Sequence, residues 1–220
     1  MTTQEKNGIT EGVIWKQLLI FFFPILVGSF FQQLYNTVDS VIVGQFVGKE
    51  ALSSVGGSAG QIISLVVGFF TGVSTGATVI ISQYFGAGKK EEIEESLHTA
   101  YAFALVGGLV LGIAGIVFAP QMLLWMNTPE ELIAESVLYV RVYFSGLIFI
   151  FIYNMGAAIL RAVGDSKRPL YYLIVCSVVN IILDLLLILV IPLGVLGAAI
   201  ATLLARVSEF AICVVCAVRS

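Results

Sequence analysis

Residues 51–88 read ALSSVGGSAGQIISLVVGFFTGVSTGATVIISQYFGAG and contain no Asp, Glu, Lys or Arg. A helix of a soluble protein needs a polar face, and an uncharged run of this length does not supply one. The stretch is long enough to cross a bilayer, because the hydrocarbon core takes about 20 apolar residues. Residues 96–129 form a second run without these charges. The two runs together predict a membrane bundle.

The composition of the whole chain supports this interpretation. Of its 220 residues, 59% are hydrophobic and only 11% are charged, whereas soluble domains carry about 25% charged residues. So few polar groups could not cover the surface of a soluble domain, so lipid is the expected solvent for much of the chain. The net charge of −3 is small and there is no basic block, which excludes nucleic acid as a partner.

Six candidate transmembrane helices are found by reading the gaps between charged residues. The fold class is therefore predicted to be all-α, a polytopic bundle of six helices that follows a polar segment. The apolar run after that segment is too long for a signal-peptide core, so the first helix is expected to be retained. The predicted N-terminal segment is 1–13, and the predicted helices are 14–47, 52–85, 97–125, 133–160, 170–191 and 196–218.

Short signals mark the connections and the packing. Residues 128–131, Thr-Pro-Glu-Glu, predict a capping box at the start of the fourth helix. Glycines spaced by four residues put small side chains on one helix face and predict close backbone approach. They are Gly56 and Gly60, then Gly68, Gly72 and Gly76, then Gly108 and Gly112.

The basic residues of the connections predict the orientation. One set of helix ends holds almost all of them, and the opposite set holds Lys49 alone. Lys and Arg accumulate in cytoplasmic loops, so both termini are expected in the cytoplasm and the chain in the inner or plasma membrane. The basic set consists of Lys6, Lys16, Lys89, Lys90, Arg161, Lys167, Arg168 and Arg219.

Ionisable residues inside spans are the main functional candidates, because they face partners or aqueous cavities. Asp184 is the only charged residue of the span 170–191, and Asp39 is the only charged residue of the span 14–47 apart from Lys16 at its start. Counted at 1.5 Å per residue, Asp184 lies about 24 Å beyond Arg168, and Asp39 about 35 Å beyond Lys16 if the helix is straight. Both carboxyl groups therefore fall in the outer half of the bilayer, where they can share one site.

Two further oxygen-bearing side chains lie near that depth. Asn180 stands one turn before Asp184, and Thr202 comes about 12 Å inward from the outer edge. Carboxylate, amide and hydroxyl oxygens suit an alkali cation or a proton, so Asp39 and Asp184 are candidate Na⁺ ligands. Desolvation and like charge favour the protonated form of at least one of them. The alternative is that each carboxylate only bonds a neighbour such as Thr37 or Ser40.

The remaining polar patterns do not indicate catalysis. Arg206 and Glu209, three residues apart, are interpreted as a structural ion pair, and Arg141 as an arginine that reaches the outer headgroups. Residues 83–90 lack the first Gly and the final Ser or Thr of a P-loop. Cys213 and Cys216 have no further ligands, so packing is the preferred interpretation. We expect no enzyme and no cofactor other than the coupling ion.

Several motifs resemble those of the MATE (multidrug and toxic compound extrusion) transporters, and the resemblance covers essentially the whole chain. QQLYNTVD at 32–39 and GQFVG at 44–48 resemble the opening of that family. ISQYFGAG at 81–88 and LRAVGDSKRP at 160–169 resemble its loops after the second and fourth helices. NIILD at 180–184 resembles its fifth helix.

The resemblance implies export of lipophilic or cationic compounds in exchange for Na⁺ or H⁺ by alternating access of two six-helix lobes. It implies a cation site in this lobe and a cavity beside it. Because the family has twelve helices, a missing C-terminal lobe or a second copy is the expected partner, besides membrane lipid. By position the cation site matches Asp39, Asn180, Asp184 and Thr202, and the cavity matches Tyr139, Gln33 and Asn36.

Other functions stay open at this point. A flippase for lipid-linked oligosaccharides, from the same wider superfamily, should line its cavity with cationic residues to meet pyrophosphate. A membrane assembly subunit that transports nothing would tolerate neutralisation of both aspartates. An intramembrane enzyme would need a nucleophile or further metal ligands at one depth.

Overall fold

The computed structural model describes residues 13–218, and the side chains of residue 13 and of residues 15–214. The expectations for Lys6, Arg219, the Cys216 thiol and all of segment 1–13 but Val13 lie outside the described residues. The described part is helical, with two π-helical segments, η1 and η2. Its elements are α1 (Ile14–Ile42), η1 (Val43–Val47), α2 (Lys49–Gly56), α3 (Ser58–Gly86), α4 (Lys90–Trp125), α5 (Glu130–Ser145), α6 (Leu147–Ala162), α7 (Lys167–Asp184), η2 (Leu185–Val190) and α8 (Gly194–Val218).

Five stretches of the described residues are long and apolar enough to cross a membrane, and the bent pair α5–α6 gives a sixth. The fourth predicted helix is thus divided in two, with a bend of 50° between its halves. The division falls at Gly146, where an added Cβ would overlap the side chain of Leu203 on α8. A residue without a side chain lets the bend pack directly against α8. The predicted all-α bundle of six helices is confirmed.

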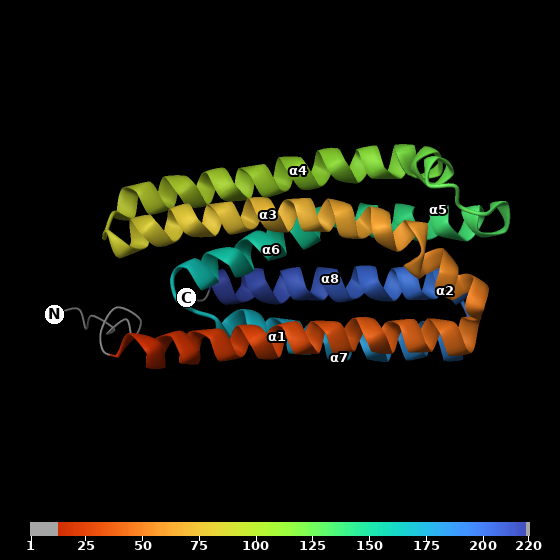
Figure 1. The fold of residues 1–220 in the computed structure, drawn as a ribbon, viewed down its shortest axis with the longest axis horizontal. Helices are drawn as coiled ribbons and strands as arrows, with labels where there is room; N and C mark the ends of the chain where they lie inside the picture. Colours follow the sequence, from red (N-terminus) through yellow and green to blue (C-terminus); the bar gives the residue numbers. More distant parts are fainter. Residues whose placement is uncertain (1–12, 219–220) are drawn as a thin grey trace.

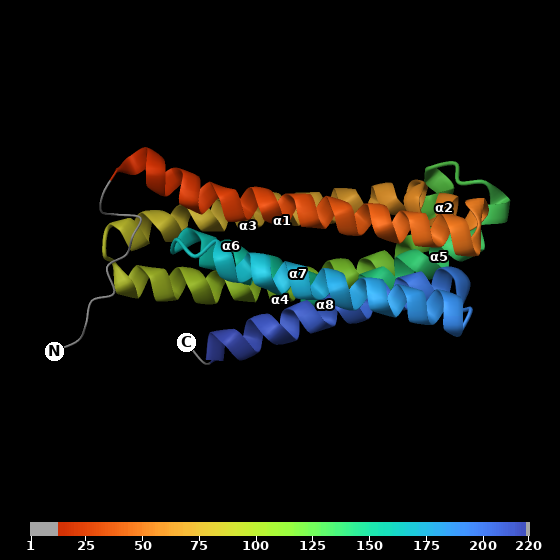
Figure 2. The same cartoon turned by 90° about the horizontal axis from the view of Figure 1, so that it is seen from below.

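The spans lie side by side along the long axis of the molecule (Figures 1 and 2). α7 packs between α1 and α8, and α6 packs against both α3 and α4. The turns after α3 and α6 lie at the end of the bundle where α1 begins and α8 ends, on the left of Figure 1. Lys89 lies in the turn after α3, and Lys90, Lys167 and Arg168 are the first residues of the helices that follow these turns. We call this the basic end, and the other the opposite end.

Small residues on α4 let its backbone approach the α5–α6 unit. The buried positions of this helix are spaced by three or four residues, so they form one stripe. An added Cβ at Gly108 would come within 2.8 Å of the Cα of Ile148, which confirms close packing there. In contrast, nothing lies within 4 Å of a Cβ at Gly68, Gly72 or Gly76. The α3 glycine stripe therefore has no packing partner within the described residues.

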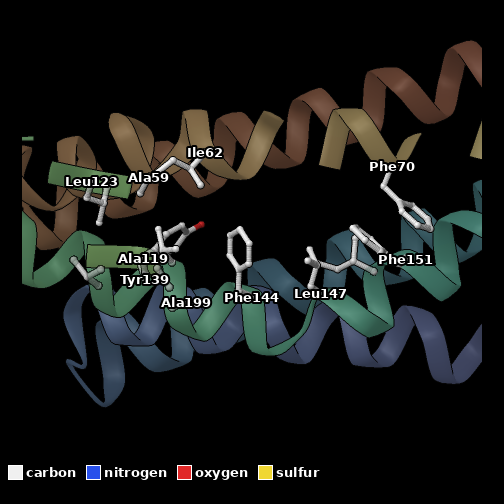
Figure 3. Packing of buried hydrophobic residues seen from close by; sticks show 14 of the residues in the cluster. Ala59, Ile62, Phe70, Ala119, Leu123, Tyr139, Phe144, Leu147, Phe151 and Ala199 are labelled. Atoms are coloured by element: carbon white, nitrogen blue, oxygen red, sulfur yellow. The ribbon is translucent and has the colours of Figure 1, made fainter. Parts of the chain in front are cut away.

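Aromatic and aliphatic side chains fill the space between α3, α4 and the α5–α6 unit (Figure 3). Phe70 of α3 stacks on Phe151 of α6 with their rings 12° from parallel. Leu147 and Phe144 continue this core on the two sides of the bend. The core holds the bent span in place.

The predicted capping box before α5 is wrong. The helix begins at Glu130 with Pro129 as its N-cap, and no side chain caps it. Pro129 has an extended backbone, with ψ 140°, so the helix starts after it instead of at it. Thr128 is thereby one residue too far away to cap the helix, and its hydroxyl has no partner in the described part of the chain.

Candidate cation site

The carboxyl groups of Asp39 and Asp184 come together near the opposite end of the bundle. α1 packs along α7, and the two side chains lie within interaction range of each other. Asp184 is fully buried. It is the last residue of α7 before η2, and Asp39 lies in the last turn of α1 before η1. π-helical turns are rare and concentrate at functional sites, so the local backbone is unusual on both sides of the pair.

The polar atoms around this pair lack protein partners. Both oxygens of Asp184, both side-chain polar atoms of Asn180, the Thr202 hydroxyl and Oδ1 of Asp39 are buried and make no hydrogen bond to the described residues. Buried polar groups in proteins are nearly always hydrogen-bonded. This arrangement of acceptors fits a proton or a small hard cation. Within the described residues no group of three His, Cys, Asp or Glu side chains could hold a metal ion. A structural zinc site needs four Cys or His ligands, so the cluster does not resemble one.

Two tyrosines enclose the cluster on its inner side. Tyr35 and Tyr139 are nearly buried, and each interacts with both Asp39 and Thr202. Tyr139 also lies beside Tyr143, with 6.4 Å between the ring centroids. Sequence reasoning named Tyr139 but missed Tyr35 as a site residue. The available signal was its position four residues before Asp39, on the same helix face.

In the simpler arrangement, the hydroxyl groups of Thr37 and Ser40 would donate hydrogen bonds to the Asp39 carboxylate. The structure does not show these bonds. The Thr37 hydroxyl donates to the carbonyl of Gln33 at 2.8 Å, and the Ser40 hydroxyl donates to the carbonyl of Asn36 at 2.9 Å. Gln33 and Asn36 themselves are exposed on α1, away from the buried cluster. Their place on a cavity wall stays a prediction.

The expected ion pair on α8 is confirmed. Arg206 Nη1 donates to Glu209 Oε2 at 2.9 Å, and the Glu209 side chain is fully buried. The guanidinium lies over the Tyr35 ring, 5.8 Å from its centroid.

The Nε of Arg141, an exposed residue on α5, donates to the carbonyl of Ile116 at 3.2 Å.

A bundle of apolar spans with carboxyl groups between its helices is typical of a membrane transporter. Comparison with known proteins makes this specific, because the family model for MatE matches residues 24–186. The chain belongs to this family, whose members are transporters and not enzymes. The resemblance inferred from the sequence motifs is thereby confirmed.

Three relatives illustrate the match. The probable multidrug resistance protein YoeA of Bacillus subtilis is 32% identical over 98% of this chain and 46% of its own length. YpnP, a probable multidrug resistance protein of the same organism, is 34% identical over 90% of this chain and 44% of its own. The outward-facing structure of a multidrug resistance MATE transporter superposes with a TM-score of 0.88 at 27% identity, over 96% of this chain and 47% of that one.

The chain spans about half the length of the curated relatives it matches. The half in question is the N-terminal lobe. The fold of one MATE lobe is thus present in this chain, and it is a multi-pass membrane protein.

Proposed function

We propose that this chain is one lobe of a secondary antiporter that exports lipophilic or cationic compounds in exchange for Na⁺ or H⁺. The observation that carries the proposal is that Asp39 and Asp184 lie within interaction range of each other. They are accompanied by buried oxygens of Asn180 and Thr202 that have no partner in the described chain. A cation or proton bound there would neutralise the carboxylates and satisfy these oxygens. The relatives named as multidrug resistance proteins support the class of substrate.

The second lobe of the transporter is the partner in this proposal. Transporter sites form at the interface between two repeats that move against each other. A C-terminal lobe, or a second copy of this chain, would supply the far wall of the substrate cavity. The exposed α1 face with Gln33 and Asn36 is the proposed near wall.

The proposal places the protein in the cell membrane with its basic end in the cytoplasm. Lys89, Lys90, Lys167 and Arg168 lie at that end, and Lys49 begins α2 at the other. The distribution follows the preference of Lys and Arg for cytoplasmic loops. The cation site then lies in the outer half of the bilayer.

Of the alternatives, the lipid-linked oligosaccharide flippase receives less support. A pyrophosphate group requires several cationic side chains, whereas the cluster consists of two carboxylates with neutral oxygens around them. Arg206, which lies over the Tyr35 ring, is already paired with Glu209. The arrangement favours a cation over a polyanion.

The test is efflux of a fluorescent lipophilic cation from cells that lack their own drug pumps. The wild-type chain, Asp39→Asn/Asp184→Asn and Glu94→Gln are compared at equal membrane levels. Glu94 is an exposed carboxylate on α4, so its variant controls for the loss of negative charge. Each form is expressed alone and together with a C-terminal lobe from a full-length relative. In at least one of these two settings we expect efflux from the wild type and Glu94→Gln, and in neither do we expect efflux from the double variant.

The same cells distinguish between the coupling ions. Collapse of the Na⁺ gradient or of the pH gradient alone should stop efflux, according to which ion drives it. Unchanged efflux in Asp39→Asn/Asp184→Asn would refute the carboxylate mechanism. Efflux that needs neither gradient would refute antiport altogether.

A further inference from the structure

A second polar cavity lies between α1, α6, α7 and α8, nearer the basic end than the cation site. Its volume is about 100 Å³. We call it the inner chamber. Its polar lining includes Gln32, Asn154, Arg161, Ser166, Arg206 and Glu209.

The inner chamber contains a buried ion pair whose hydrogen bonding is incomplete. Glu209 is fully buried and accepts from Arg206 through Oε2. Its Oε1, and Nε of Arg206, have no hydrogen-bond partner in the described chain. A water molecule takes about 30 Å³ of liquid volume, so the chamber has room for about three. It therefore provides the space and the polar lining in which water can solvate the pair.

The inner chamber is linked at its outer side to the cation site. Thr202, Arg206 and Glu209 follow one another at intervals of four and three residues, so they share one face of α8. The Arg206 guanidinium lies over the ring of Tyr35, and Tyr35 interacts with both Asp39 and Thr202. Glu209, Arg206 and Tyr35 thus follow one another toward the carboxylate pair, and Tyr35 interacts electrostatically with Asp39.

At its other side the inner chamber reaches the basic end. Arg161 stands in the last turn of α6, and Ser166 is the N-cap of α7. Both line the chamber, and the turn between them is also the site of the Asp165 cap on α7. The polar lining therefore extends from a surface turn to the ion pair.

We propose that the inner chamber is a proton-selective path between the basic end and the Asp39–Asp184 site, with Glu209 as the proton carrier and Arg206 as the barrier to other cations. This inference rests on the proposed antiport function and assigns H⁺ as the ion exchanged with the cytoplasm. A metal ion that enters meets the positive charges of Arg161 and Arg206 and a carboxylate already paired with one of them. Fixed arginines in a narrow passage oppose every free cation, hydronium included, so a proton passes only when it is bound to a carboxylate.

A proton differs from Na⁺ because it forms a covalent bond with the carboxylate. It adds to the free Oε1 of Glu209, which becomes neutral and loosens its bond to Arg206. The same proton then leaves through water toward Tyr35 and the two aspartates, and Glu209 pairs with Arg206 again. The carrier returns to its starting state, so one proton enters and one proton leaves.

The other groups around the ion pair do not replace Glu209 in this role. Tyr143, Tyr153 and Cys176 face it from α5, α6 and α7. Phenols and buried thiols keep their protons near neutral pH, and the Cys176 thiol donates to the carbonyl of Ala205 at 3.3 Å. Glu209 is the one carboxylate among the residues that line the inner chamber.

The test separates proton coupling from transport itself in proteoliposomes that contain the full chain. Dye counterflow without any ion gradient reports folding and alternating access, and accumulation of dye against an imposed pH gradient reports coupling. For Glu209→Gln we expect counterflow close to wild type and pH-driven accumulation lower by about 100-fold, the usual contribution of a positioned proton carrier. Glu209→Asp should restore part of it, and Ser208→Ala, on the same helix, should match the wild type.

Further variants cover the case in which Glu209→Gln leaves Arg206 unpaired and unstable. Arg206→Gln/Glu209→Gln removes both charges and should also lose pH-driven accumulation while it keeps counterflow. Arg206→Gln alone should admit Na⁺, so that Na⁺ on the basic side inhibits proton coupling. Normal pH-driven accumulation in both variants that carry Glu209→Gln would overturn the path. Equal loss of counterflow and coupling in both would show a structural pair and would overturn it too.

The outcomes also distinguish this path from the proposed function. Absence of counterflow in the wild type, both alone and when reconstituted with a C-terminal lobe from a full-length relative, refutes the antiporter, and the path with it. Counterflow in the wild type with coupling that survives at Glu209→Gln refutes the path alone.

Discussion

Asp184 on α7 is fully buried and the partly buried Asp39 on α1 lies within interaction range of it, although no cationic side chain is paired with either in the described chain. Arg206, over the neighbouring Tyr35 ring, is bonded to Glu209 instead. Two like groups are thus desolvated together, and each disfavours ionisation of the other. Such a pair lowers the stability of the fold. Binding and active sites often carry a stability cost of this kind.

The first prediction concerns that unfavourable contribution. Asp184→Asn keeps the shape of the side chain and removes one acid from the pair. We expect the free energy of unfolding to rise by about 1–3 kcal/mol, because an uncompensated buried charge is destabilising, while dye efflux is lost. Thermal unfolding in detergent measures the change. A large fall in unfolding temperature would mean that Asp184 has a structural hydrogen-bonding role.

The second prediction uses two adjacent glycines on α4. A Cβ at Gly108 would lie 2.8 Å from Cα of Ile148, whereas one at Gly107 would lie 3.6 Å from Phe70 Cε2, an ordinary contact. Gly108→Ala should therefore destabilise the bundle by about 1–3 kcal/mol, the usual effect of overpacking. Gly107→Ala is the matched control and should leave stability unchanged or raised. The unfolding temperatures of the two purified variants decide, and equal values would contradict the α4–α6 packing.

The architecture could be predicted from the sequence because lipid imposes simple requirements. Each span must satisfy its own backbone, so uncharged runs mark helices directly. The bend at Gly146 could not be predicted in this way. It depends on Leu203, far along the chain, whose side chain fills the space a Cβ would need. Hydropathy does not detect that contact, because both halves of the bent span are apolar.

The candidate site was partly predictable for a related reason. Single charges in apolar spans stand out, so Asp39 and Asp184 could be named and their depth estimated. Tyr35 could not be distinguished from other aromatic residues by composition. Its position depends on how α1 turns toward α8, which brings its ring under Arg206. The capping box failed for a local reason, because Pro129 adopts an extended backbone before α5 instead of its first helical turn.

The third prediction concerns the turn between α6 and α7, which closes the inner chamber. Oδ1 of Asp165 accepts the backbone N–H groups of Lys167 and Arg168, each at 3.1 Å, and Oδ2 pairs with Arg168 Nε at 3.0 Å. Asp165→Ala removes the cap and should lower the free energy of unfolding by about 1 kcal/mol. Asp165→Asn keeps an acceptor oxygen and loses only an exposed ion pair, so its effect should be smaller.

Chemical denaturation of the two variants, with an unchanged denaturant dependence, gives both values. If Asp165→Asn were as destabilising as Asp165→Ala, the ion pair with Arg168 would matter more than the cap. That result would contradict the role assigned here to the backbone hydrogen bonds of α7.

The fourth prediction fixes the sidedness on which the direction of antiport depends. With the three native cysteines replaced by alanine, Lys49→Cys at the opposite end and Glu91→Cys at the basic end are labelled in intact cells with a maleimide that does not cross membranes. Lys49 and Glu91 are both exposed, so access is limited only by the membrane. We expect label on Lys49→Cys in intact cells and on Glu91→Cys only after the membrane is opened, because basic turns stay on the cytoplasmic side. The reverse pattern would place the inner chamber at the outer surface, and protons would then enter the proposed path from outside the cell.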